Sequence, residues 1–126
     1  MNETGISFKR LIKSFGYAIN GIRLMIKQEQ NAKIHLFFML FVVVMGMLFH
    51  LSVAEWLSLV LVSGGVFTAE VFNTSIEALS DTIAPEYNKN IKQVKDFAAG
   101  AVLVVSITAI IVGLIVFLPK IIVLFT

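Results

Sequence analysis

The chain alternates long apolar runs with short polar segments, and residues 34–51 and 97–125 are two uninterrupted runs. Crossing the hydrocarbon core of a bilayer takes roughly 20 mostly apolar residues, with about 17 as the lower limit. In the run over 34–51 the only strongly polar residues are the histidines near its two ends, His35 and His50. The run over 97–125 carries no charge before Lys120. These patterns predict the first and third membrane-spanning helices of an all-α integral membrane protein.

A further predicted span, residues 53–80, starts apolar and becomes polar halfway along. Its first half contains WLSLVLVSGGVF, whereas its second half carries Glu70, Asn73 and Glu77. On an α-helix these three positions share one face, and Thr74 and Asp81 extend the polar stripe. Each ionised carboxylate in the hydrocarbon costs about 2.5 to 3.5 kcal/mol or more, so the stripe is expected to face protein or a wet cleft.

The residues before the first span predict an amphipathic helix over 6–32. Apolar residues recur there at helical spacing: Phe8, Leu11, Ile12, Phe15, Ile19, Ile22 and Ile26. The complementary face is polar and mostly basic: Lys9, Arg10, Lys13, Asn20, Arg23 and Lys27. This pattern is typical of a helix lying in the membrane interface, with its basic side near anionic headgroups. A soluble arm that packs on the protein's own surface is the alternative, and both descriptions can hold.

Composition agrees with a single membrane domain over residues 1–126, because 58% of the residues are hydrophobic and only 14% are charged. Cysteine is absent, which excludes disulfides and thiolate metal sites. No cleavable signal is indicated at the N-terminus. All Lys and Arg residues except Lys120 lie at or before Lys33 or between Lys89 and Lys95. Basic residues favour the cytoplasm, so the N-terminus and the loop 82–96 are predicted inside and the C-terminus outside.

The acidic stripe suggests a divalent metal site. Hard cations such as Mg²⁺ take oxygen ligands, usually one or two carboxylates plus substrate phosphates and waters. Glu77 together with Glu29, in the polar segment KQEQN before the first span, would suffice. Two plainer interpretations stay open. Glu29 can belong to a solvated charge pair, and Asn73 with Thr74 can join helices through hydrogen bonds while the glutamates are protonated.

Lys95 is a candidate phosphate-binding residue, because a cation at the start of the third span can neutralise phosphate. The small residues Ala98, Ala99 and Gly100 that follow permit close helix approach. The alternative is an ordinary cytoplasmic anchor. The chain has no G-x-x-x-x-G-K-[ST] loop, so any nucleotide site must be of another kind. His35 and His50 are too far apart along one helix to share a metal, and His35 is assigned no catalytic role.

Two motifs together resemble the small prokaryotic diacylglycerol kinase family, whose Gram-positive branch phosphorylates undecaprenol. The first is E-V-F-N-T-S-I-E-A-L-S-D over 70–81, and the second is K-D-F-A-A-G-A-V-L over 95–103. Matches at Arg10, Gly16, Tyr17, Gly21 and Glu29 extend the resemblance over most of the chain. It implies an ATP- and Mg²⁺-dependent kinase of the bacterial plasma membrane that phosphorylates a lipid hydroxyl. It also implies a homotrimer with active sites between subunits near the cytoplasmic surface.

The same resemblance assigns roles to individual positions. Glu70 would be the general base on the lipid hydroxyl, and Glu29 and Glu77 would hold the metal ions that bridge the ATP phosphates. Lys95 would contact phosphate and Asp96 would lie near the nucleotide. Arg10 and Tyr17 would help to hold the nucleotide. Three further residues would line the site: Asn73, Thr74 and Asp81. Carboxylates, a Lys and a base form a sufficient set, because phosphoryl transfer relies mainly on positioning and charge neutralisation.

The acceptor and the class of protein each have a competitor. The position of His35 is typically acidic in the Gram-negative branch, so this chain resembles the undecaprenol kinases more than the diacylglycerol kinases. A small ion or proton transporter subunit is the alternative outside the kinases, because intramembrane carboxylates also mark ion paths. Polarity stops halfway across the membrane, as the outer halves are almost purely apolar, which favours a one-sided enzyme. No nucleic-acid partner is expected.

Overall fold

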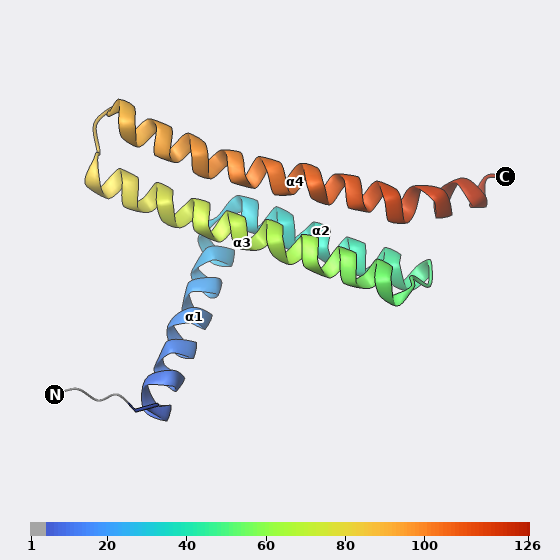
Figure 1. The fold of residues 1–126 in the computed structure, drawn as a ribbon, viewed down its shortest axis with the longest axis horizontal. Helices are drawn as coiled ribbons and strands as arrows, with labels where there is room; N and C mark the ends of the chain where they lie inside the picture. The colour runs from blue at the N-terminus through green and yellow to red at the C-terminus, as the bar shows by residue number, and fades with distance from the viewer. Residues whose placement is uncertain (1–4) are drawn as a thin grey trace.

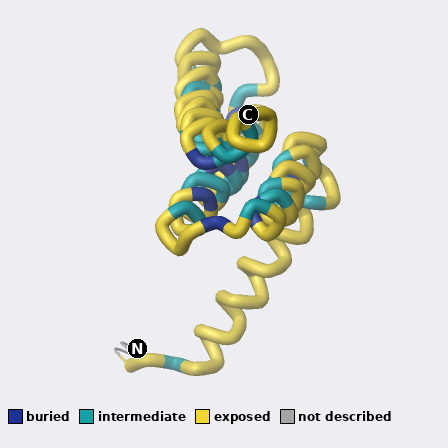
Figure 2. The backbone as a smooth tube through the Cα atoms, turned by 90° about the vertical axis from the view of Figure 1, so that its right-hand side faces the viewer, coloured by how far each residue is buried: buried dark blue, intermediate teal, exposed yellow. Residues whose placement is uncertain are grey.

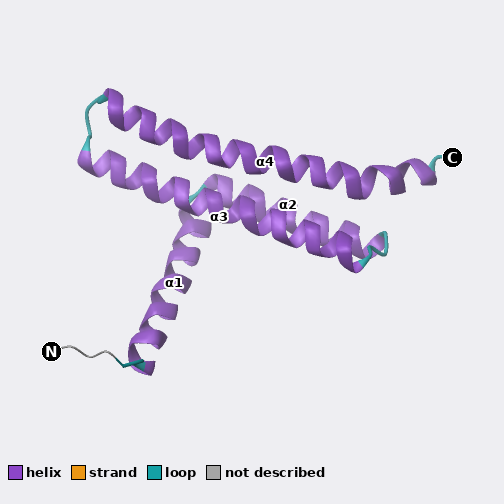
Figure 3. Cartoon of the chain, viewed as in Figure 1, coloured by secondary structure: helices purple, strands orange, loops and turns teal. Residues whose placement is uncertain are grey.

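Four helices make up the described part of the chain, residues 5–126, in the computed structural model (Figure 1). Residues 1–4 of the predicted domain lie outside it. The helices are α1 (Phe8–Gln28), α2 (Gln30–Leu48), α3 (Val53–Ile83) and α4 (Lys89–Leu124). Only helices and short connections occur between residues 5 and 126 (Figure 3). The prediction of an all-α protein is confirmed.

Helix α1 ends earlier than the predicted helix over 6–32. Its start is capped by the Ser7 side chain, which accepts a hydrogen bond from the backbone N–H of Arg10. It ends at Gln28, and the next residue, Glu29, has extended backbone (φ −101°, ψ 121°) although its N–H still donates to the carbonyl of Met25. The same residue precedes the first turn of α2. The extended residue Glu29 therefore interrupts the segment that the pattern predicted as one helix. Residues 30–32 belong instead to α2, the helix of the first span.

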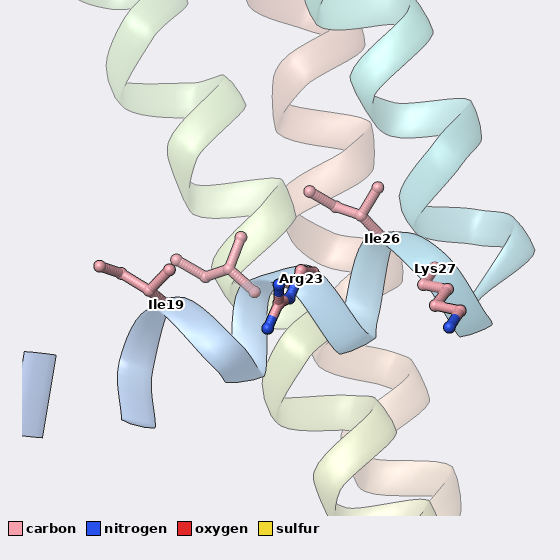
Figure 4. A pocket seen from close by; sticks show the side chains of 5 residues that line it. Ile19, Arg23, Ile26 and Lys27 are labelled. Atoms are coloured by element: carbon pink, nitrogen blue, oxygen red, sulfur yellow. The ribbon is translucent and has the colours of Figure 1, made fainter. Parts of the chain in front are cut away.

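Helix α1 leaves the bundle instead of packing along it (Figure 1, Figure 2). Its apolar residues are exposed along nearly the whole length, and Met25, close to α2, is its one buried residue. A shallow hollow on its surface is lined by Ile19, Ile22, Arg23, Ile26 and Lys27 (Figure 4). The isoleucines and the two cationic ends point in different directions from the helix. A location in the membrane interface stays a prediction.

Three helices, α2, α3 and α4, are long and apolar enough to cross a membrane by length and composition. The turn after α2 places His50 in the left-handed region (φ 52°). Ser52 and Glu55 then form a reciprocal capping box that starts α3. The three predicted spans therefore correspond to three helices, although α2 already ends at Leu48.

The polar connection before α4 is shorter than the predicted loop 82–96. Helix α3 continues to Ile83, and Asn88 caps α4 by accepting from the backbone N–H groups of Asn90 and Ile91. Because α4 begins at Lys89, Lys95 and Asp96 lie on a helix that is continuous with the third span. Helical geometry, not a flexible loop, fixes the direction of both side chains.

Helix α3 packs against both α2 and α4, more extensively against α4, and α2 lies behind α3 in Figure 1. The buried apolar cluster is at the end where α3 begins, around Leu51, Leu59 and Val116. Gly46 lets α2 approach closely there, since a Cβ at this position would lie 2.5 Å from the Trp56 ring. The packed core and the polar stripe thus occupy opposite ends of α3.

Candidate active site

The polar stripe of α3 turns toward the neighbouring helices over most of its length. Glu70 is 4% exposed, and Asn73, Thr74 and Glu77 are partly buried. Asp81, one turn further on, is exposed. Ser80 is also buried at 4% exposure and belongs to the same inward side. The stripe therefore grades from a buried carboxylate inside the bundle to an open one at the end of α3.

Glu70 is contacted by a histidine on another helix. The Nε2 atom of His35, on α2, lies 3.2 Å from Oε1 of Glu70. The Glu70 side chain is 6% exposed and the His35 side chain 23% exposed, so both are largely withdrawn from the surface of the chain. An ionised Glu70 would accept a hydrogen bond from the His35 N–H group. This contact supplies a polar partner for the most deeply buried carboxylate.

Lys95 reaches the stripe from α4. Its Nζ atom lies 2.9 Å from Oδ1 of Asp81, and it also interacts electrostatically with Glu77 and Asp96. Asp96 itself forms an ion pair with Lys92, one turn earlier on α4, at 2.7 Å. The structure thus pairs Lys95 with Asp81, and Glu77 is a weaker electrostatic neighbour. It directs Asp96 to its own helix instead.

Asn73 has an unpaired oxygen at the centre of the stripe. Its Oδ1 atom is buried and, within residues 5–126, has no hydrogen-bond partner. Such an atom costs about 1 to 3 kcal/mol if nothing binds it. Glu70 and Glu77 lie one turn away on either side of it, on the same face of α3. An amide oxygen between two carboxylates is a donor set that suits a hard divalent cation.

The predicted site residues on α1 and at its end are less closely associated with the polar stripe of α3. Glu29 is partly buried at the junction of α1 and α2. Arg10 and Tyr17 lie on α1, which extends away from the bundle (Figure 1). No group of three or more His, Cys, Asp or Glu side chains able to hold a metal forms among residues 5–126. Arg10 and Tyr17 are thus on a different part of the fold from the stripe of α3.

The helical rise fixes the spacing of the carboxylates along α3. At one end, Glu55 of α3 pairs with Lys120 of α4 at 3.2 Å. With roughly 1.5 Å of rise per residue, Glu70 lies about 22 Å and Glu77 about 33 Å from Glu55 along α3. His35 lies about 8 Å from the start of α2 by the same rule. The two ends of α3 are therefore both charged, and Glu70 lies between them.

An apolar groove of about 390 Å³ is bounded by α2, α3 and α4. His35 and Val66 are among its lining residues, and Ser63, Ser106 and Gly113 are the small residues in its walls. Because Val66 lies one turn from Glu70 on α3, the groove leads along the bundle toward the buried His35 and Glu70 pair. The most polar contact inside the bundle is thus reached from an apolar surface.

His35 is the site residue that the sequence did not indicate. Its neighbours on α2 are apolar, and a single histidine near a span end is commonly an interfacial residue. The signal that could have found it is the unsatisfied carboxylate: Glu70 needs a partner, and His35 is a polar residue at matching depth on the first span. Depth alone, however, does not tell which face of α2 meets α3.

Comparison with known proteins settles the family. The model of the prokaryotic diacylglycerol kinase family matches residues 16–117, which includes the whole polar stripe and Lys95. The chain belongs to this family. The resemblance noted in the two motifs is therefore confirmed, and the chain is a lipid kinase. A transporter subunit is not its class.

Two relatives of the kinase differ in the acceptor that their names give. The undecaprenol kinase of Bacillus subtilis (strain 168) is 40% identical over 111 residues, which cover 88% of this chain and 90% of that protein. The diacylglycerol kinase of Synechocystis sp. is 37% identical over 110 residues, 86% of this chain but only 63% of that protein. The kinase is thus similar over nearly its full length to a relative of about the same size.

Proposed function

We propose that this kinase transfers the γ-phosphoryl group of ATP to the hydroxyl of undecaprenol at the cytoplasmic surface of the bacterial plasma membrane. The observation that carries the proposal is the buried Glu70 carboxylate, held on the inward side of α3 in a chain of the lipid kinase family. A buried carboxylate with a histidine partner is a suitable general base for a hydroxyl group.

The depth of the carboxylates supports a reaction at the inner membrane surface. The hydrocarbon core is about 30 Å thick. If Glu55 and Lys120 mark its outer boundary, Glu70 lies within the core near the inner boundary, and Glu77 lies just beyond it. The bias of basic residues puts the N-terminus and the α3–α4 connection on the cytoplasmic side, where ATP is present. A lipid hydroxyl can then meet Glu70 while the lipid stays in the membrane.

In the proposed mechanism each residue acts at a stated atom. One oxygen of Glu70 takes the proton of the lipid hydroxyl while the hydroxyl oxygen attacks the γ-phosphorus of ATP. The bond between the γ-phosphorus and the oxygen that joins it to the β-phosphate breaks. Lys95 turns from Asp81 toward phosphate and compensates its negative charge. Asn73 and Thr74 line the space between Glu70 and Glu77, and Asp81 is the group that holds Lys95 before phosphate binds.

The residues present fit a divalent cation such as Mg²⁺. The buried Asn73 oxygen has no partner within residues 5–126, so a bound cation would satisfy it, and Glu77, one turn away, supplies the type of oxygen that Mg²⁺ prefers. We propose Glu77 and Glu29 as the protein ligands, with nucleotide phosphates completing the set. When bound, such an ion would neutralise charge on the phosphates during transfer.

The exposed helix α1 supports a shared active site. Most of its apolar residues are exposed, and its basic residues Arg23 and Lys27 lie beside Ile19 and Ile26 (Figure 4). We propose that α1 lies in the cytoplasmic interface of a homotrimer, where Arg10, Tyr17 and Asp96 help to hold a nucleotide together with Lys95. Three spans in one chain bury little surface, so association with further copies is physically favoured.

Undecaprenol is the preferred acceptor because the relative named for it matches over 90% of its own length. The relative named as a diacylglycerol kinase provides a specific reason to test that lipid as the second candidate. Purified kinase in lipid bilayers should phosphorylate undecaprenol with ATP and Mg²⁺ at a kcat/KM above that for diacylglycerol. A higher kcat/KM for diacylglycerol would reassign the acceptor and leave the kinase unchanged.

Replacement of Glu70 by Gln tests the proposed base. The amide keeps the size of the side chain and removes its basicity, so kcat should fall by about 10² to 10⁴-fold while thermal stability stays close to that of the parent. The matched control is Glu86→Gln, which makes the same change at an exposed position in the α3–α4 connection. Turnover by the Glu70→Gln variant near the parental rate would show that the base lies elsewhere.

A further inference from the structure

The contact between His35 and Glu70 joins two helices at the most buried carboxylate of the chain. Nε2 of His35 lies 3.2 Å from Oε1 of Glu70. The two residues are 35 positions apart in the sequence, so the contact depends on how α2 packs against α3. Only one oxygen of Glu70 is engaged. Within residues 5–126 the second oxygen, Oε2, has no such partner, and the apolar groove lined by His35 and Val66 comes within one turn of Glu70 along α3.

A general base acts on a hydroxyl group only when one of its oxygens is held toward that group. A hydrogen bond from an imidazole N–H to one oxygen of a carboxylate fixes the rotation of the carboxylate. The 3.2 Å contact between Nε2 of His35 and Oε1 of Glu70 therefore gives His35 one effect on Glu70, which is to set the direction of the second oxygen.

We propose that His35 is the positioning residue of Glu70: its Nε2–H group holds Oε1, so that Oε2 is presented to the hydroxyl of the lipid acceptor. This inference rests on the proposed role of Glu70 as the base. In this arrangement His35 does not contact ATP, and it takes no proton from the lipid acceptor. Its loss should therefore reduce the rate of the chemical step and leave the binding of nucleotide unchanged.

The test compares two substitutions of equal length. Gln places an amide N–H group near the position of the imidazole Nε2–H, whereas Met fills similar space without a donor. With the full-length kinase in bilayers, His35→Met should lower kcat about tenfold or more with unchanged KM for ATP, as expected for loss of one hydrogen bond to a charged group. His35→Gln should recover most of that loss. His50→Asn, at the exposed turn after α2, should behave like the parent.

A purely structural role predicts a different pattern. If His35 only held α2 against α3, Gln and Met would lower the thermal stability, and kcat of the folded protein would not separate the two variants. Equal kcat for His35→Met and the parent, or equal losses in His35→Met and His35→Gln, would overturn the inference. Thermal unfolding of each variant in the same lipid supplies the comparison.

Combination with Glu70→Gln separates this inference from the proposed function. If Glu70 is the base and His35 acts through it, adding His35→Met to Glu70→Gln should cause no further loss of kcat. A full tenfold loss on top of Glu70→Gln would contradict the positioning role alone. Parental activity in Glu70→Gln by itself would instead contradict the base assignment, whatever His35→Met does.

Discussion

The two ends of the helical bundle are built on different principles. The end near the α2–α3 turn is dry and closely packed, with Gly46 against Trp56, Phe49 against Phe117, and Leu51, Leu59 and Val116 in the core. The opposite end holds the polar stripe, with an unpaired Asn73 oxygen, and α1 extends away from it. One end thus supplies contacts for folding, while the other retains polar groups that favour a bound ligand.

This difference suggests that stability and catalysis can be perturbed separately in the kinase. Apart from the Glu55–Lys120 ion pair, packing at the dry end consists of van der Waals contacts between apolar side chains. The Lys92–Asp96 and Lys95–Asp81 ion pairs at the polar end are exposed, and exposed pairs contribute little to stability. Substitutions at the polar end should therefore change activity more than stability, and substitutions at the dry end should do the reverse.

The largest effect in this comparison is expected for Lys95→Met. Loss of one hydrogen bond to a charged group corresponds to about 1.5 to 3 kcal/mol, so KM for ATP should rise by at least about tenfold. Its partner Asp81 is exposed and can be solvated, so the melting temperature should change little. Lys89→Met, at the start of the same helix, is the control. An unchanged KM for ATP would remove Lys95 from the nucleotide site.

A smaller effect, on stability and not on activity, is expected for Gly46→Ala. The added Cβ would meet the Trp56 ring, and overpacking costs about 1 to 3 kcal/mol, more than the roughly 1 kcal/mol that Ala gains over Gly within a helix. Gly64→Ala is the matched control, because a Cβ there meets no atom within 4 Å. Thermal unfolding should rank Gly46→Ala below the parent and Gly64→Ala at or above it. The reverse order would contradict the packing seen at this end.

The smallest effect is expected at the outer ion pair. Lys120→Met removes the partner of Glu55, but the capping hydrogen bonds between Glu55 and Ser52 remain. A double-mutant cycle with Glu55→Gln should give a coupling free energy of roughly 0 to 1 kcal/mol, and Mg²⁺-dependent turnover should be unchanged. A large loss of turnover in Lys120→Met would mean that the dry end also takes part in the reaction.

Much of this arrangement was predictable along each helix. Spans were visible as apolar runs, and the stripe of Glu70, Asn73 and Glu77 followed from helical spacing alone. Boundaries were less accurate, because helices continue through polar residues when local hydrogen bonds permit. That is why α4 begins at Lys89 and carries Lys95 and Asp96 on a helix where a loop was expected. Similarly, the extended residue Glu29 divides a pattern that had no Gly or Pro to mark the break.

Relations between helices could not be predicted in the same way. The sequence by itself determined the number of spans, the acidic stripe and the motifs that identify the family, because these depend on local periodicity and residue type. The tertiary structure decided that His35 meets Glu70, that Lys95 meets Asp81 and that α1 leaves the bundle. Such contacts depend on how each helix is rotated and tilted against its neighbours, and that rotation is set by the packing of many side chains together.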